Sequence, residues 1–150
     1  MAPGDLHRNA GVVTVALFRG VGVILLVVAA IHFAVTPTLL RDVLDGHIDA
    51  GAARIVRASF LLNHLVVGVL LIPIGLSTAF AAGGIWRGEP LARRIGWTNA
   101  LAVLALPPVI AAVMGRAEIL SGGPFTVAAG LVVLAAAAMI AGMWCTRPER

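Results

Sequence analysis

Four long stretches without a charged side chain fill most of this chain. They cover residues 20–40, 58–86, 95–115 and 119–146 of the sequence. A helix needs about 20 consecutive apolar residues to cross roughly 30 Å of hydrocarbon, and each stretch reaches that length. The sequence therefore predicts an all-α integral membrane protein, folded as a four-helix bundle.

The composition supports this prediction and excludes several other classes of protein. Hydrophobic residues make up 60% of the chain and charged residues 12%, whereas soluble domains average about 25% charged residues. Little of the 150-residue chain is left for a soluble catalytic domain, which needs about 50 residues or more. All eleven basic residues are arginines dispersed between the apolar stretches, so nucleic-acid binding is not expected.

We expect one transmembrane domain over residues 1–150, preceded by a short flexible tail. The tail is expected over residues 1–12, and the spans at about 13–38, 58–86, 93–114 and 123–145. Seven arginines then lie on the side of the two termini and four on the other side, which favours termini inside. The seven are Arg8, Arg19, Arg87, Arg93, Arg94, Arg147 and Arg150, and the four are Arg41, Arg54, Arg57 and Arg116.

The tryptophans give an independent indication of the same topology. Trp86, Trp97 and Trp144 all fall at the face where the termini lie, and indole rings prefer the membrane interface. We therefore expect a multi-pass protein of the inner (cytoplasmic) membrane of the cell, with both termini in the cytoplasm.

Residues 41–57 connect the first two spans and have an amphipathic pattern. Apolar side chains recur at helical spacing among aspartates and arginines, which predicts a short helix lying on the outer membrane surface. A solvated loop is the alternative, because each glycine in the segment costs up to about 1 kcal/mol in a helix. The apolar positions are Val43, Leu44, Ile48, Ile55 and Val56, and the glycines are Gly46 and Gly51.

Two histidines lie inside the predicted spans, where an ionisable side chain indicates a functional site. His32 stands eight residues before Leu40, and His64 stands six residues after Ala58. At 1.5 Å per residue, these positions lie about 12 and 9 Å below the outer surface. Neighbouring antiparallel helices would therefore hold both imidazoles at one level in the outer leaflet, within about 10 Å of each other.

Small residues indicate which way His64 points. Small side chains mark helix contacts inside membranes, so His64 is expected to face the bundle. Thr36, one turn after His32, is expected within hydrogen-bonding reach of the His32 ring. The small residues that share the broad helix face of His64 are Gly68, Gly75, Ala79 and Gly83.

Three interpretations of the histidine pair stay open. His32 and His64 could ligate a haem or a metal ion, because imidazole is a common metal ligand. Alternatively, His32, Thr36, Asn63 and His64 could bind a quinone, a lipid or another small apolar ligand through hydrogen bonds. The third interpretation is that the histidines only join helices by hydrogen bonds, each contributing roughly 0.6–2 kcal/mol. Asn99 fits an interhelical or interfacial role better than that of a ligand.

The function expected from these residues is ligand or cofactor binding by a small polytopic membrane protein. The alternatives are an accessory or structural subunit of a larger membrane complex, and a haem- or metal-binding redox protein. None of the seven acidic residues lies inside a span, which argues against a proton-coupled exporter. No phosphate loop, zinc pattern or nucleophile elbow occurs, and whether the chain is an enzyme stays open. The lipid bilayer is one partner, and a membrane protein or a second copy is another candidate.

Overall fold

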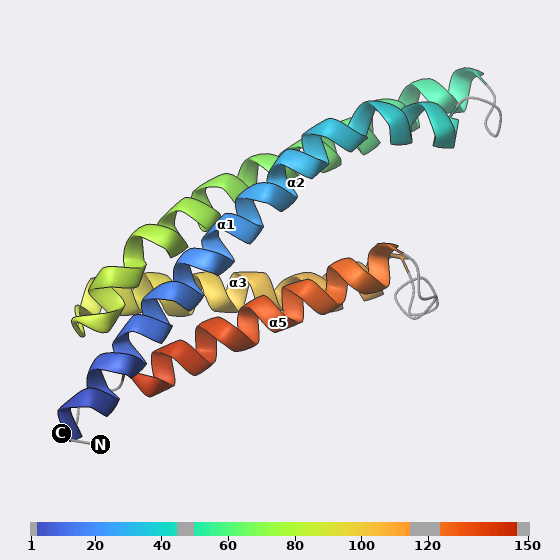
Figure 1. Cartoon of the computed structure of the whole chain (residues 1–150). Coiled ribbons are helices and arrows are strands. Elements are labelled where there is room, and N and C mark those ends of the chain that lie inside the picture. Colours follow the sequence, from blue (N-terminus) through green and yellow to red (C-terminus); the bar gives the residue numbers. More distant parts are fainter. Residues whose placement is uncertain (1–2, 45–49, 115–123, 147–150) are drawn as a thin grey trace. The chain divides into compact units, whose positions relative to one another are not determined.

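The computed structural model describes residues 3–44, 50–114 and 124–146 of the chain. Within these residues all regular elements are helices, and no strand occurs. The all-α class predicted from the sequence is therefore confirmed. The helices, drawn in Figure 1, are α1 (Pro3–Leu44), α2 (Ala50–Trp86), α3 (Pro90–Met114) and α5 (Pro124–Cys145).

The prediction of a flexible N-terminal tail is wrong for the residues from Pro3 onward, which are helical. α1 begins at Pro3 and runs without interruption into the first apolar stretch. Proline is well suited to the first position of a helix, since its fixed φ is helical and its missing N–H has no partner there. Extending an existing helix also needs no new nucleation step, so the polar N-terminal residues join α1.

The expected separate helix between the first two spans is also not observed. Residues 41–44 are the last turn of α1, and residues 50–57 are the first turns of α2. The same cooperativity explains this difference, because growth of two long helices is favoured over nucleation of a third, short one. The rest of this prediction lies outside the described residues, namely residues 45–49 with Ile48, and the side chains of Val43, Leu44 and Ile55.

Two of the helices contain segments long and apolar enough to cross a membrane. These are Ala10–Thr38 in α1 and Val56–Trp86 in α2, with 29 and 31 residues. α5 contributes a shorter apolar segment, Ala129–Cys145. These assignments depend on length and composition and cover only the part of the chain that the structure describes.

The chain packs as two compact units, and the boundary between them cuts both α1 and α2. Met1–Val21 and Ser77–Arg150 form the first, which we call the terminal unit. Gly22–Leu76 forms the second, which we call the hairpin unit. Each unit is described separately below.

The terminal unit has a core of large side chains from four helical segments. α3 and α5 lie side by side over much of their length (Figure 1). Two glycines allow the close packing: a Cβ atom on Gly96 would lie 3.0 Å from side-chain atoms of Ile85 and Met143, and one on Gly142 would lie 2.9 Å from the Phe18 ring. The largest fully buried side chains of this core are Phe18, Ile85, Met139, Met143 and Val103.

Buried polar side chains also join the helices of the terminal unit. The Asn99 amide of α3 donates hydrogen bonds to the hydroxyl oxygens of Ser77 and Thr78 in α2, at 2.8 and 2.9 Å. Thr78 is fully buried and Asn99 nearly so. The interhelical role expected for Asn99 is thus observed.

The hairpin unit consists of the second part of α1 and the first part of α2, which run antiparallel beside each other (Figure 1). The helices approach closely at Gly75, where a Cβ atom would lie 2.9 Å from the backbone oxygen of Gly22. A Cβ atom on Gly68 would lie 3.0 Å from the Phe33 ring. Gly68 and Gly75 therefore face α1, as the small-residue pattern predicts, and they set the spacing of the helices around the histidines.

Candidate functional site

His32 of α1 and His64 of α2 lie against each other in the hairpin unit. Their ring centroids are 5.1 Å apart, and the ring planes are tilted by 38°. Both side chains are partly buried. The pair is therefore closer than the 10 Å limit that the depths of the two residues predict.

One nitrogen of His32 is held by the backbone of its own helix. His32 Nδ1 lies 2.9 Å from the carbonyl oxygen of Val28. A carbonyl oxygen can only accept a hydrogen bond, so Nδ1 carries the proton, and in the neutral ring Nε2 is left as an acceptor. This contact fixes both the tautomer and the direction of the ring.

His64 lies in contact with two other rings. The Phe60 ring stacks on it with centroids 5.2 Å apart and planes inclined by 14°, while His32 packs nearby. No described residue forms a hydrogen bond with the His64 ring. A neutral His64 therefore offers one N–H donor and one nitrogen acceptor to a ligand.

The other two residues predicted for the site, Thr36 and Asn63, have different surroundings in the structure. Thr36 is buried, with 3% of its surface exposed, and its hydroxyl donates to the His32 backbone carbonyl rather than to the ring. The structure therefore brings the His32 and His64 rings together. The Thr36 side chain is bonded to the His32 backbone and not to a ring, and Asn63 is exposed.

Phe60 is a member of this cluster that the sequence analysis did not include. It precedes His64 by four residues, and side chains four apart lie on one helix face. That spacing could have identified the stack. The sequence contains five phenylalanines, and only the helical register relates this one to the histidine.

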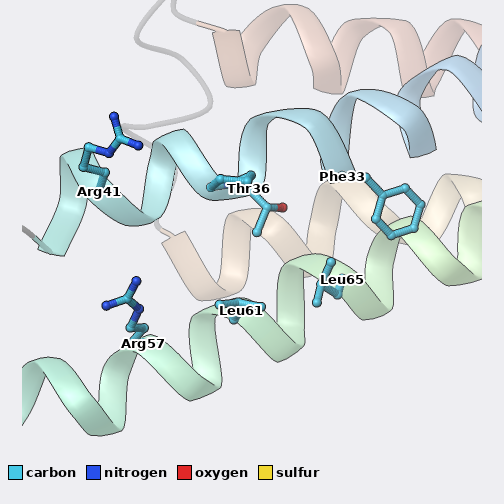
Figure 2. A pocket seen from close by; sticks show the side chains of 7 residues that line it. Phe33, Thr36, Arg41, Arg57, Leu61 and Leu65 are labelled. Atoms are coloured by element: carbon cyan, nitrogen blue, oxygen red, sulfur yellow. The ribbon is translucent and has the colours of Figure 1, made fainter.

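A pocket of about 430 Å³ lies between the two helices of the hairpin unit. Figure 2 shows its lining side chains, with Phe33, Thr36 and Arg41 on α1 facing Arg57, Leu61 and Leu65 on α2. Pro37 completes the lining on α1.

The pocket is apolar at one end and cationic at the other. Arg41 and Arg57 stand at the same end, one on each helix (Figure 2), and both are exposed. Phe33, Leu61 and Leu65 provide the apolar walls. Among the described residues, neither guanidinium group forms an ion pair.

The distance between the two imidazole rings distinguishes a haem bound between them from a single metal ion with tetrahedral ligands. Each metal–nitrogen bond takes about 2 Å, so imidazoles on opposite sides of one iron have ring centres more than about 6 Å apart. The observed 5.1 Å does not fit a haem between the rings. It does fit two ligands at a tetrahedral angle, for which the ring centres are about 5 Å apart. Within the described residues, however, no group of three histidine, cysteine, aspartate or glutamate side chains could hold a metal ion.

Comparison with known proteins identifies no relative of this chain. No protein-family model matches it, and no match was found among curated proteins or solved structures.

Proposed function

We propose that this chain is a four-span protein of the inner (cytoplasmic) membrane that binds a small ligand at the His32–His64 pair. The low burial of the two candidate spans supports the membrane part of the proposal. Only 33% of the most apolar part of each segment is buried, whereas the core helix of a soluble protein would be mostly buried. Large apolar side chains such as Phe80 and Leu62, which are 81% and 66% exposed, would then contact lipid.

The lengths of α3 and α5 support two further spans. With 25 and 22 residues, these helices measure about 37 and 33 Å at 1.5 Å per residue, enough for the hydrocarbon core. Both expose large apolar side chains, among them Leu101 and Leu134 at 59% and 67%. A four-span chain has both termini on one side, and the arginine bias favours the cytoplasm for that side.

The close contact of two imidazoles from separate helices is the observation that carries the ligand-binding proposal. His32 presents Nε2 as an acceptor, because its Nδ1 proton is used by Val28. His64 presents a donor and an acceptor, and Phe60 adds an aromatic face. This set suits a small apolar ligand with a carbonyl or hydroxyl group, such as a quinone, which needs few polar contacts in an otherwise apolar site.

Titration of the purified protein with a short-chain quinone tests this proposal. His64→Ala removes one hydrogen-bonding group, worth about 1 to 1.5 kcal/mol, and is expected to weaken binding about tenfold. Asn63→Ala is the matched control, since Asn63 is adjacent in sequence but exposed, and its affinity should stay within about twofold of wild type. Circular dichroism checks that both variants fold. Unchanged quinone affinity in folded His64→Ala protein would reject the pair as the site.

A divalent metal ion is a second candidate ligand, favoured by the anchoring of His32. Metal-binding histidines usually donate their second ring N–H to a carbonyl or carboxylate, as His32 does to Val28. Metal analysis of the protein purified without chelator, in wild type and in His32→Ala, tests this candidate. If a metal ion is the ligand, wild-type protein should carry it in stoichiometric amount and the variant should lose it. Protein that binds neither quinone nor metal would favour the accessory-subunit alternative, in which the pair only packs the helices.

A further inference from the structure

We infer that the pocket between α1 and α2 binds an anionic phospholipid, with the lipid phosphate between Arg41 and Arg57 and the start of an acyl chain along Phe33, Leu61 and Leu65. This inference rests on the membrane embedding in the proposed function. It concerns a site separate from the histidine rings, since neither imidazole lines the pocket. The same two helices hold both sites, on neighbouring positions of their facing surfaces.

The position of the arginines relative to the apolar segments supports a lipid. The apolar segment of α1 ends at Thr38 and that of α2 begins at Val56. Arg41 follows Thr38 by three residues, about 4.5 Å along the helix, and Arg57 is next to Val56. Both guanidinium groups would then lie at headgroup level, and the pocket would extend from there into the hydrocarbon layer.

The charges of the pocket select an anionic headgroup. Arginine has a planar fork of N–H donors that matches a phosphate group. Arg41 and Arg57 are both exposed and stand at the same end of the pocket (Figure 2). Two cations facing each other across one opening repel, so an anion bound between them relieves that repulsion as well as forming new hydrogen bonds.

The apolar end of the pocket distinguishes a lipid from a soluble anion. A free phosphate ion would occupy only the opening and leave Phe33, Leu61 and Leu65 uncovered. A volume of about 430 Å³ is at the small end of the range for ligand pockets. It accommodates a phosphate with the adjoining part of one chain, while the rest of the lipid would lie along the outer surface of the helices.

Competition between two lipids in nanodiscs tests the inference. The full chain is reconstituted in phosphatidylcholine with a minor fraction of spin-labelled phosphatidylglycerol, or of spin-labelled phosphatidylcholine as reference. We expect wild-type protein to immobilise phosphatidylglycerol preferentially. Replacing both arginines (Arg41→Gln with Arg57→Gln) should reduce the preference about 30-fold, the equivalent of roughly 2 kcal/mol for two arginines.

Two further variants separate the pocket from general charge effects. Arg94→Gln removes an exposed arginine outside the pocket and should leave the preference within about twofold of wild type. Leu65→Trp keeps both charges but fills the apolar end, so it should lower immobilisation of phosphatidylglycerol severalfold. An equal loss in Arg94→Gln, or an unchanged preference in the double variant, would overturn the assignment to this pocket.

The remaining outcomes distinguish failure of this inference from failure of the proposed function. Resistance to carbonate extraction from native membranes is measured first, because a protein that extracts as peripheral would refute both. An integral protein without preference for phosphatidylglycerol would refute the lipid site alone. Displacement of the spin-labelled lipid by inorganic phosphate at equal concentration would show a soluble-anion site and would also overturn the inference.

Discussion

Arg93 shows how a single residue can have a structural role that its sequence position does not reveal. The sequence analysis counts it only as a positive charge beside the membrane. In the structure its guanidinium donates to the backbone oxygens of Thr146 and Met143, at 3.0 and 3.2 Å. These carbonyls belong to the end of α5, where backbone acceptors have no helical partner, so Arg93 caps a helix about 50 positions away.

Removal of this cap should lower the stability of the terminal unit. We expect Arg93→Gln to reduce the free energy of unfolding by about 1 to 2 kcal/mol, since the lost hydrogen bonds are charge-assisted. Arg94→Gln is the matched control, because it removes an adjacent arginine that is exposed. Unfolding in a detergent–SDS titration, followed by circular dichroism, measures both variants. Equal stability of the two would contradict the capping role.

At the histidine site, the sequence predicts which residues of α1 and α2 lie beside each other better than it predicts the direction of their side chains. Counting residues from the span ends correctly places His32 and His64 beside each other, since helical rise is constant. Asn63 is exposed although it precedes His64 directly, because one position along a helix turns a side chain by about 100°. Thr36 is expected from the sequence to bond the His32 ring, but its hydroxyl donates to the His32 backbone carbonyl instead. A threonine hydroxyl in a helix readily bonds the carbonyl four residues earlier.

At the scale of the helices, the sequence predicts the ends of α3 and α5 to within three residues, but it misses both ends of α1 and the start of α2. The charged residues flanking each apolar stretch set the expected limits, whereas α1 and α2 continue through them. Charge marks where a helix leaves the hydrocarbon and does not stop the backbone from remaining helical. α1 and α2 also continue through Pro37 and Pro73, as membrane helices often do when neighbouring groups satisfy the freed carbonyls.

The approach of α1 and α2 is the packing feature that depends most on one residue. A side chain at Gly75 would meet the backbone of Gly22 at 2.9 Å, and backbone cannot move aside as a flexible side chain can. We expect Gly75→Leu to destabilise the hairpin unit by about 1 to 3 kcal/mol through overpacking. The SDS titration used for Arg93→Gln measures this change.

Gly20→Leu is the control for the glycine prediction. It makes the same change in helix propensity, about 1 kcal/mol in favour of leucine, but nothing lies within 4 Å of a Cβ atom there. This variant should be as stable as wild type or more stable. A Gly75→Leu protein that behaves like Gly20→Leu would show that the close approach is not needed.

At the scale of the whole molecule, the proposed topology depends on whether α3 and α5 cross the membrane as α1 and α2 are expected to. Four spans place the connection between α1 and α2 and that between α3 and α5 outside, with the short turn between α2 and α3 inside. Two spans would leave the last two connections on the same side as the termini. The arginine bias alone does not separate these topologies, because Arg116 is the only arginine between α3 and α5.

Labelling with a membrane-impermeant maleimide separates the two topologies in intact cells. In a Cys145→Ser background, which removes the single native cysteine, we expect His47→Cys and Ser121→Cys to be labelled and Leu91→Cys to be labelled only after lysis. Leu91 is a suitable inner position because it is 70% exposed. Labelling of His47→Cys without Ser121→Cys would indicate two spans. Labelling of Leu91→Cys alone would reverse the orientation, and it would move the Arg41–Arg57 pocket to the cytoplasmic leaflet, where anionic lipids give the membrane its negative surface potential.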